Sequence, residues 1–299
     1  MTKSGYCTIV GKPNAGKSTL LNAFLGEKLS ITTSKPQTTR KRVLGIYNDD
    51  NTQIIFLDTP GILDPEYLLQ EKMLEHVLLS AKDADVLLII VDAGNPNVVK
   101  EFYENGQIQH LLKFEQPKIL AINKIDIIDQ ERLNTLVEEF GKTKQFNKII
   151  PISAIGSFGV SELLETIKEM LPEHPKFYPD DQLSDANERF FVSEIIREKI
   201  FEMYKEEIPY STEVVVDEFK EREGRKDYIS ASIILERDSQ KPIIIGKKGA
   251  KIKELGQKSR EEIEEFLQRP VYLELHVKVR PKWRSNPMML KQFGYDIGD

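Results

Sequence analysis

The sequence predicts an α/β domain with a mostly parallel sheet flanked by helices, followed by a smaller α+β domain. The chain has 299 residues, enough for two cores at roughly 100 to 200 residues per domain. From Tyr6 to about Leu171, short β-branched runs alternate with longer helical patterns, which is typical of parallel strands with crossover helices. The order of elements changes after a proline-rich break. We therefore expect domains at residues 1–171 and 190–299, joined by a linker at 172–189.

Five short apolar runs are the strand candidates of the first domain. They are Cys7–Val10, Gln53–Leu57, Val86–Val91, Ile119–Ile122 and Lys148–Ile152. Each run ends in residues that could bind a ligand. In open α/β sheets, ligands bind beyond the carboxyl ends of the strands, so we expect the site to lie where these runs end.

The segment 172–189 interrupts this pattern with prolines and with the acidic residues Asp180, Asp181 and Asp185, and we interpret it as an ordered or semi-rigid linker. After it the sequence predicts the order helix, strand, strand, helix, strand. The expected bounds are Glu188 to about Glu206, Thr212–Phe219, Tyr228–Glu236, Ala250 to about Gln268, and Val271–Val279. The second of these helices carries an apolar stripe at three- and four-residue steps, which predicts packing on a sheet.

The charge of the chain is unevenly distributed. The whole sequence has 42 Lys plus Arg against 48 Asp plus Glu, a formal net charge of −6, which argues against nonspecific nucleic-acid binding. Residues 220–299, however, hold 18 basic and 13 acidic side chains, a net of 18 − 13 = +5, which leaves −11 for residues 1–219. We therefore expect a polyanion such as a nucleic acid to be held at one end of the chain only, with strong salt dependence.

Membrane insertion and secretion are not indicated. The longest aliphatic run, Val86–Val91, is far shorter than the ~20 residues of a membrane-spanning helix. Residues Met1–Gly11 lack the basic and apolar regions of a signal peptide. The single cysteine, Cys7, lies in an apolar run and is interpreted as a core residue rather than a nucleophile. These features favour a cytoplasmic protein.

The first strand candidate leads into the P-loop pattern G-x4-G-K-[ST], and a helix follows. Backbone N–H groups of such a turn point at phosphate oxygens, and the helix N-terminus adds its positive end. We expect Lys17 to reach the β- and γ-phosphates and the Ser18 hydroxyl to bind Mg²⁺. The expected nucleotide-binding residues here are Gly11, Lys12, Pro13, Asn14, Ala15, Gly16, Lys17, Ser18 and Thr19.

A second phosphate-binding segment follows the next strand candidate. It consists of Asp58, Thr59, Pro60 and Gly61, with Ile62 after them. Asp58 can hold Mg²⁺ through water, and the Gly61 N–H can meet the γ-phosphate. All five residues are therefore expected at the nucleotide.

The polar, basic stretch 34–40 lies between these two segments and fits neither a helix nor a strand pattern. We expect a mobile loop that becomes ordered around the γ-phosphate and Mg²⁺. Thr39 is the expected metal ligand and Thr38 its neighbour at the nucleotide. A plain solvated loop is the alternative.

The base is predicted to be guanine. The expected base-binding residues are Asn123, Lys124, Ile125 and Asp126 after one strand candidate, and Ser153 and Ala154 after the next. The Asp126 carboxylate can accept hydrogen bonds from guanine N1 and N2, which adenine does not offer in that arrangement. The Lys124 stem would lie along the base, Asn123 would tie this loop to the P-loop, and the last two residues would offer N–H groups to O6. GTP is expected, with ATP as the alternative.

The second domain contains a G-x-x-G motif between an isoleucine run and its second helix. The motif alone is weak, since the chain holds an uncharged copy at Gly156–Gly159. The second-domain copy contains two lysines and precedes a basic helix, so its backbone and helix N-terminus can approach a phosphate chain closely. The expected RNA-contacting residues are Gly246, Lys247, Lys248, Gly249, Lys251 and Lys253. A solvated basic helix face is the alternative.

Two side-chain groups near this motif allow more than one interpretation. Residues 243–245 and Ile252 are candidates to line an apolar groove for bases, with core packing as the alternative. Trp283, the single Trp, lies among basic residues. We expect it to pack within its own domain, with base stacking as the alternative.

Taken in order, these motifs resemble those of a translation-factor-class GTPase, and residues 58–61 with the loop 37–40 are similar to the Era family in particular. The second domain resembles the KH domain at the C-terminus of Era proteins. The resemblance implies hydrolysis of GTP to GDP and phosphate with Mg²⁺, and binding of the 3′ end of 16S rRNA during 30S ribosomal subunit assembly and rRNA maturation. It also allows weak peripheral association with the cytoplasmic face of the membrane. We expect a monomer.

Catalysis is expected to depend on Lys17, Thr39 and Gly61. Many small GTPases carry, after this glycine, a glutamine that orients the attacking water, whereas this chain has Ile62. Slow intrinsic turnover is therefore expected. In related GTPases an Asn at the position of Asn14 helps to bind a monovalent cation, so we expect K⁺ to accelerate hydrolysis. The alternative is that Asn14 is a turn residue only.

The two sites and the short linker lead us to expect that the nucleotide state changes RNA binding. A nucleotide-gated adaptor for protein or membrane partners is the alternative function. A tRNA-modifying GTPase is disfavoured because no catalytic Cys follows the first domain.

Overall fold

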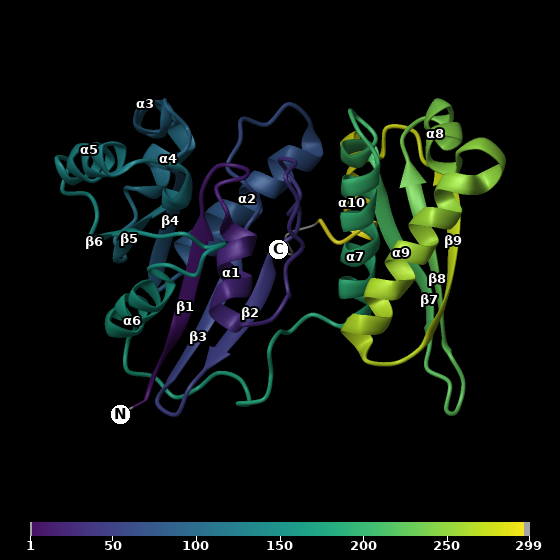
Figure 1. Cartoon of the computed structure of the whole chain (residues 1–299), viewed down its shortest axis with the longest axis horizontal. Coiled ribbons are helices and arrows are strands. Elements are labelled where there is room, and N and C mark those ends of the chain that lie inside the picture. Colours follow the sequence, from purple (N-terminus) through teal and green to yellow (C-terminus); the bar gives the residue numbers. More distant parts are fainter. Residues whose placement is uncertain (1, 296–299) are drawn as a thin grey trace. The chain divides into compact units, whose positions relative to one another are not determined.

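The computed structural model describes residues 2–295. Contacts between residues divide the chain into two compact units, and each is described by itself. The first unit comprises residues up to Pro65 and Gln70–Asp185, and the second comprises Glu66–Leu69 and the residues from Ala186 onward. Figure 1 shows the elements of both.

The first unit contains a six-stranded sheet with the strand order β2-β3-β1-β4-β5-β6. All neighbours are parallel except β2 and β3, which are antiparallel. The strands are β1 (Lys3–Val10), β2 (Val43–Asn48), β3 (Thr52–Asp58), β4 (Val86–Asp92), β5 (Lys118–Asn123) and β6 (Lys148–Pro151). The five predicted strands are confirmed with shifted ends, and β2 is an additional edge strand.

Helices cover both faces of this sheet (Figure 1). One face carries α1 (Lys17–Leu25) and α6 (Val160–Met170), and the other carries α2 (Leu68–Lys82), α3 (Val98–Glu104), α4 (Gly106–Leu111) and α5 (Gln130–Gly141). Phe102 and Phe140 pack into the core over β4 and β5. On the opposite face Phe24 stacks on Phe56, with 4.6 Å between ring centroids. Both faces are therefore buried, which explains the continuously apolar strands.

Parallel pairing brings the carboxyl ends of the strands to one edge of the sheet. The P-loop follows β1, Asp58 ends β3, Asn123 ends β5, and Ser153 lies just beyond β6. These segments are far apart in the sequence, and the sheet places them side by side, as expected for an open α/β fold.

The segment that we expected to be a linker lies largely along the first unit. The N–H of Ile46 on β2 donates to the Leu183 carbonyl at 2.8 Å, and Lys3 forms an isolated bridge with Glu173. The Ser184 hydroxyl donates to the Leu44 carbonyl at 2.5 Å. Residues 183 and 184 thus cover the edge strand β2, and residue 173 lies beside the start of β1. The two units meet in sequence at Asp185 and Ala186.

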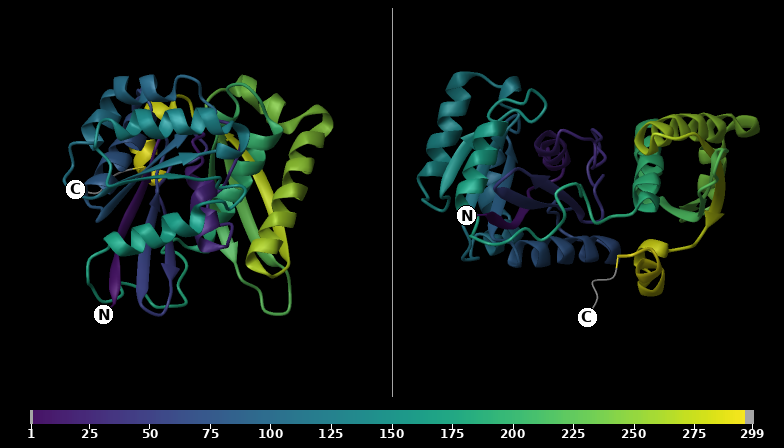
Figure 2. Two further views of the ribbon diagram at one scale, coloured as in Figure 1. Left: turned by 60° about the vertical axis from the view of Figure 1, so that its left-hand side comes forward. Right: turned by 90° about the horizontal axis from the view of Figure 1, so that it is seen from below.

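The second unit is a three-stranded sheet with helices on one face (Figure 2). The strand order is β7-β8-β9, with β7 antiparallel and β9 parallel to β8. Its elements are α7 (Glu188–Met203), β7 (Glu213–Lys220), β8 (Asp227–Leu235), α8 (Lys241–Ile245), α9 (Ala250–Leu267), β9 (Val271–Val279) and α10 (Pro287–Gln292). The predicted elements are confirmed, and the short helices α8 and α10 are additional.

Several 3₁₀ turns connect these elements. They are η1 (Ile125–Ile127), η2 (Pro209–Ser211), η3 (Asp238–Gln240), η4 (Lys247–Gly249) and η5 (Trp283–Ser285). The first lies in the predicted base-binding loop and the fourth in the G-x-x-G motif. Irregular backbone therefore occurs at both predicted sites.

Cys7 and Trp283 are both fully buried. Cys7 is thus a core residue as expected, and burial raises the pKa of its thiol, which disfavours the nucleophilic thiolate. The Trp283 indole N–H donates to the Ser211 carbonyl at 2.9 Å. Packing of Trp283 within its own unit is therefore confirmed, and its ring does not offer a face to a base.

Between residues 2 and 295, no helix has the length and apolar character needed to cross a membrane.

The segment 172–185 depends on the buried side chain of Gln53. Its Oε1 accepts hydrogen bonds from the Phe177 and Tyr178 N–H groups at 2.7 and 3.0 Å, and its Nε2 donates to the Tyr178 carbonyl at 2.8 Å. The substitution Gln53→Leu should lower the free energy of unfolding by about 2–3 kcal/mol, because these backbone groups lose their partner. Urea denaturation followed by circular dichroism measures this.

The control is Gln130→Leu, since Gln130 is exposed and its side-chain amide donates to Asn134, four residues on. We expect a change within about 0.5 kcal/mol there. Equal losses in the two variants would show that Gln53 does not anchor the segment.

Candidate nucleotide site and nucleic-acid interface

The P-loop connects β1 to α1 and lines a pocket of about 290 Å³. Asn14 and Gly16 have positive φ values of 61° and 100°, and Gly16 is the N-cap of α1 with no side-chain cap. A Cβ on Gly16 would lie 2.2 Å from Asn123 Nδ2, and one on Gly11 would lie 2.4 Å from the Ile90 carbonyl oxygen. Glycine is therefore required at both positions, and the helix N-terminus faces the pocket uncapped.

Lys17 is buried inside this turn. Its Nζ donates to the backbone carbonyls of Gly11 and Lys12 at 3.1 and 2.9 Å. Burial lowers the pKa of Lys17 to about 8, although the nearby Asp58 carboxylate opposes the shift. The partners of this ammonium are neutral carbonyls and a carboxylate that only partly offsets the cost of burial. The phosphates of a bound nucleotide would supply the negative charge that stabilises it.

The three predicted metal ligands lie together. Ser18 Oγ is 2.9 Å from Thr39 Oγ1 and donates to Asp58 Oδ2 at 2.6 Å. Burial raises the pKa of Asp58, while its hydrogen bond with Ser18 and the charge of Lys17 oppose the rise. Its other oxygen, Oδ1, is buried and makes no hydrogen bond of good geometry with any described residue.

This donor set fits Mg²⁺, a hard cation that binds through one or two carboxylates plus hydroxyls, waters and substrate phosphates. The part of the chain from residue 2 to 295 has no cluster of three His, Cys, Asp or Glu that could hold a metal. The two hydroxyls and the buried carboxylate are thus the candidate Mg²⁺ ligands.

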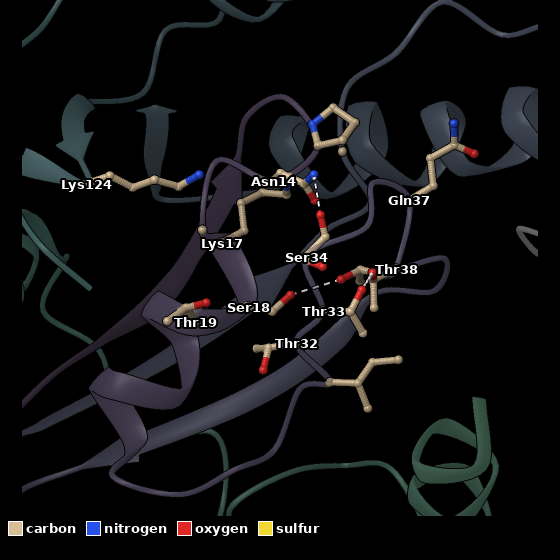
Figure 3. Close-up of a pocket in the computed structure, with 15 residues that line it drawn as sticks. Asn14, Lys17, Ser18, Thr19, Thr32, Thr33, Ser34, Gln37, Thr38 and Lys124 are labelled. Atoms are coloured by element: carbon tan, nitrogen blue, oxygen red, sulfur yellow. Dashed lines mark hydrogen bonds between the residues drawn. The ribbon is translucent and has the colours of Figure 1, made fainter. Parts of the chain in front are cut away.

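Thr38 is oriented differently from Thr39. Its hydroxyl lies 2.6 Å from Thr33 Oγ1 and donates to the Lys35 carbonyl at 2.9 Å. Figure 3 shows Asn14, Lys17 and Ser18 on one side of the pocket and Thr33, Ser34 and Thr38 on the facing loop. Thr38 therefore stabilises the loop, and Thr39 is the threonine directed at Ser18.

Asn14 links the P-loop to the facing loop. Its Nδ2 donates to the Ser34 carbonyl at 3.1 Å (Figure 3). Both Asn14 and Ser34 line the pocket, as does Thr19 at the start of α1. The Asn14 side chain thus lies where the phosphate turn and the loop 34–40 approach each other.

Residues 59–62 contribute mainly backbone to this site. The Thr59 hydroxyl donates to the Ile9 carbonyl at 2.8 Å, away from the pocket, and Pro60 is buried beside it. A Cβ on Gly61 would lie 2.7 Å from the Pro13 nitrogen, so this glycine allows the segment to touch the P-loop. Ile62 is buried in the core, and its N–H donates to the Gly11 carbonyl at 3.0 Å. None of these four side chains offers a polar group to the pocket.

The base-binding loops are joined by Asn123. Its Nδ2 donates to the Ala15 carbonyl at 2.8 Å, and its Oδ1 accepts the Ala154 N–H at 3.0 Å. This is the link to the P-loop that the sequence predicts, and it extends to the loop after β6. Ser153 is buried, while Asp126 is exposed on η1, where it can meet a base. The Ile125 N–H donates to the Ile152 carbonyl at 3.3 Å and joins the two loops.

Asp92 is a site residue that we did not predict. Lys124 has a positive φ of 65°, and its Nζ lies 2.5 Å from Asp92 Oδ2. This ion pair fixes the stem that is expected to lie along the guanine plane. The signal was available in the sequence, since Asp92 ends a strand of the parallel sheet. Lys12 likewise pairs with Glu101 at 2.9 Å, so its side chain supports the P-loop from outside.

The G-x-x-G motif of the second unit forms a strained turn between α8 and α9. Gly246, Lys248 and Gly249 have φ values of 72°, 52° and 78°. Gly249 is the N-cap of α9 and offers no side chain to it. Lys247 and Lys248 are exposed, as are Lys251 and Lys253 on the first turn of α9. Lys247 and Lys248 thus lie within the turn itself, whereas Lys251 Nζ lies over the Tyr204 ring, 5.6 Å from its centroid.

The isoleucines on either side of this motif have different environments. Ile244 is fully buried, Ile243 is 42% exposed, and the Ile252 side chain is half-buried. The expected groove can thus use Ile243 and Ile252 but not Ile244. The uncharged copy at 156–159 closes a tight turn in which Ser153 and Phe158 exchange backbone hydrogen bonds.

Comparison with known proteins connects both sites to a family. Residues 6–124 match the family model "50S ribosome-binding GTPase", and residues 207–284 match "KH domain". The chain is 48% identical to GTPase Era of Geobacter sp. strain M21 over 295 residues, which are 98% of each protein. The chain belongs to the Era family of GTPases. It therefore has a GTPase domain followed by a KH domain, and it hydrolyses GTP to GDP and phosphate.

Other Era proteins agree over the whole length. GTPase Era of Syntrophus aciditrophicus is 46% identical, with 99% of this chain and 96% of the relative covered. The solved structure of a point variant of Aquifex aeolicus Era bound to GDP·AlF4⁻ has a TM-score of 0.92 at 42% identity, covering 99% of this chain and all of that one. Era in complex with MgGDPNP and nucleotides 1506–1542 of 16S ribosomal RNA has the same TM-score at 43% identity and the same coverage.

The lowered pKa of Lys17 predicts proton uptake on nucleotide binding. Bound phosphates raise the pKa of the ammonium above its value of about 8 in the protein alone. At lower pH Lys17 is protonated with or without nucleotide, and this group adds no pH dependence. Above that value, binding takes up a proton, and the affinity for GDP should fall by up to about tenfold per pH unit.

Isothermal titration calorimetry of GDP binding in two buffers with different ionisation enthalpies measures this uptake. Lys17→Arg serves as control, because a guanidinium stays protonated over this range. Equal proton uptake by the variant and the unmodified protein would assign the effect to another group.

Proposed function

We propose that this protein binds GTP and GDP with Mg²⁺ in its first unit and the 3′ end of 16S rRNA in its second, and acts in 30S subunit assembly and rRNA maturation. The observation that supports this most is the presence of both sites on one chain that matches, over its whole length, Era solved with MgGDPNP and with 16S nucleotides 1506–1542. The gathered Ser18, Thr39 and Asp58 and the exposed lysines of the G-x-x-G turn are consistent with it.

The phosphate site favours GTP hydrolysis through position and charge. Lys17 neutralises the β- and γ-phosphates, and the uncapped N-terminus of α1 adds N–H donors. Ser18, Thr39 and Asp58 would hold Mg²⁺, which supplies charge neutralisation at the phosphate oxygens when bound. The Gly61 N–H meets the γ-phosphate.

The attacking water is not oriented by a side chain at position 62. Ile62 is 2% exposed and carries no polar group. We therefore infer slow intrinsic turnover, with water placed by backbone groups of residues 59–61 and of the loop 34–40.

Guanine is selected by a carboxylate, and Asp126 accepts the N1 and N2 hydrogens. The expected contacts of the Ser153 and Ala154 N–H groups with O6 are not formed in this arrangement, because these groups donate to the Phe158 carbonyl and to Asn123 Oδ1. Asp92 holds the Lys124 stem against the base plane. An adenine would leave the Asp126 carboxylate without its donors, and such unpaired polar groups give strong discrimination.

RNA is bound at the positive end of the second unit. The G-x-x-G turn lets the phosphate backbone approach the N-terminus of α9, where Lys247, Lys248, Lys251 and Lys253 add charge. Ile243 and Ile252 are apolar surfaces for unstacked bases.

A cytoplasmic location follows from this proposal, because the RNA partner is part of the ribosome. We also propose that the protein acts as a monomer. Peripheral membrane association stays an expectation of the family resemblance.

The RNA proposal is tested with the double variant Lys247→Asp/Lys248→Asp. It should weaken binding of an oligonucleotide matching the 3′ end of 16S rRNA and of 30S particles. If both ammonium groups contact phosphates, the slope of log affinity against log salt should also decrease by about 1.4, at ~0.7 per contact for single strands. Fluorescence anisotropy over a salt series measures both quantities.

The matched control is Lys205→Asp/Lys226→Asp, which makes the same charge change at two exposed lysines outside the motif. It should weaken binding only slightly. Unchanged RNA binding by the motif variant would favour a nucleotide-gated adaptor instead.

We also propose that K⁺ accelerates hydrolysis through Asn14. This residue joins the phosphate turn to the loop 34–40, where a monovalent cation could neutralise charge near the phosphates. GTP turnover should be about tenfold faster in KCl than in NaCl at matched ionic strength, a barrier difference of about 1.4 kcal/mol. Phosphate release measures this rate.

The substitution Asn14→Gly tests this role, because glycine adopts the positive φ of 61° without strain and removes the side chain that bonds the Ser34 carbonyl. It should bind GDP normally and lose the preference for K⁺. Equal rates in the two salts for the unmodified protein would leave Asn14 a turn residue only.

A further inference from the structure

Ser30 lies between α1 and the loop 34–40, and its backbone is held by one side chain. Asn22 on α1 accepts hydrogen bonds at Oδ1 from the Leu29 and Ser30 N–H groups at 3.0 and 2.9 Å. Its Nδ2 donates to the Ser30 carbonyl at 2.8 Å. Both polar backbone groups of Ser30 are thus satisfied by Asn22, which holds this part of the backbone against α1.

The Ser30 hydroxyl has no comparable partner. It is 2% exposed, and among residues 2–295 its Oγ makes no hydrogen bond of good geometry. The same holds for Asp58 Oδ1, on a carboxylate that is fully buried. The hydroxyl nevertheless lies within contact distance of this carboxylate.

Two neighbouring buried polar atoms without good hydrogen bonds are unfavourable for folding. Each costs free energy relative to an apolar replacement, and such atoms call for an explanation in a site that binds an ion. A serine that served only to fill space could be an alanine, because Asn22 bonds its backbone alone. The hydroxyl therefore does not stabilise the fold, and its role is expected in the protein with bound ligand.

We propose that Ser30 is a positioning residue of the Mg²⁺ site, in which its hydroxyl hydrogen-bonds the second oxygen of Asp58 and orients this carboxylate for the metal. The inference rests on the proposed binding of Mg²⁺ with GTP or GDP. Groups that bond and orient a metal-binding carboxylate typically change metal affinity ten- to a hundredfold when removed. Ser30 also adjoins Ile31, which lines the nucleotide pocket, so the start of the loop that carries Thr39 is tied to the same carboxylate.

The test is the Mg²⁺ dependence of GDP binding by Ser30→Ala. A fluorescent GDP analogue is titrated at a series of free Mg²⁺ concentrations, and the thermal midpoint of the protein without nucleotide is measured in parallel. We expect the Mg²⁺ concentration for half-maximal effect to rise about tenfold or more. The thermal midpoint should stay the same or increase, because an unpaired buried hydroxyl is removed.

Ser4→Ala is the matched control. Ser4 is fully buried at the start of β1, its Oγ is also without a hydrogen bond among the described residues, and it lies at the opposite end of that strand from the P-loop. It should leave the Mg²⁺ dependence unchanged. Ser30→Thr keeps the hydroxyl and should restore most of the Mg²⁺ affinity.

The outcomes separate the inference from the function on which it rests. If GDP binding by the unmodified protein did not depend on Mg²⁺, the proposed metal site itself would be wrong. If it did, and Ser30→Ala matched the unmodified protein, the role of Ser30 would be overturned. A lowered thermal midpoint in Ser30→Ala, with no rescue by threonine, would also overturn it, because Ser30 would then be needed only for packing.

Discussion

The nucleotide site depends above all on the side-chain amide of Asn123. One end of this amide bonds the P-loop at Ala15 and the other bonds the loop after β6 at Ala154. Three segments that are distant in the sequence are thereby fixed relative to one another, in a buried setting where a lost partner costs about 1–3 kcal/mol. Gly16 has no Cβ because the amide occupies that space. The spacing between the phosphate end and the base end of a nucleotide is set by this single side chain.

Around that frame, the charged groups are arranged for a ligand rather than for the fold alone. Lys17 is buried against backbone carbonyls, and Asp58 is buried with one oxygen lacking a good hydrogen bond. Burial shifts the pKa of each toward its neutral form, and a polyanion with a divalent cation reverses both shifts. The two groups lie close enough for their charges to oppose these shifts, so metal and phosphate are expected to bind as one unit.

Most of the fold and of the nucleotide site could be predicted, because each nucleotide-binding motif directly follows a strand. In a parallel sheet the carboxyl ends of the strands lie at the same edge, so the motifs come together there. The edge strand β2 was missed because it follows a basic loop and pairs antiparallel. The helix α8 was missed because an isoleucine run favours a strand, whereas a proline at its start and burial of Ile244 favour a helix here. Thr38 and Thr39 are adjacent in sequence, and only the hydrogen bonds of the loop decide which one faces Ser18. Asp92 follows the strand-end pattern but belongs to no motif, and its ion pair with Lys124 gives it a role at the site. Ser30 lies in no predicted element, so only its burial in the fold reveals it.

The helices differ in how they begin. Helices α4, α5, α7 and α10 start with an Asp or Asn whose side chain accepts a hydrogen bond from the first turn. Helices α1, α6 and α9 start with a left-handed glycine and no side-chain cap, and two of them, α1 and α9, lie at the nucleotide site and at the proposed RNA surface. The first N–H groups of α1 and α9 lack the side-chain partner that the four capped helices carry in their own sequence. A phosphate group would complete α1 and α9, so each ligand would take the place of a capping side chain, and its departure would leave a helix end with exposed donors.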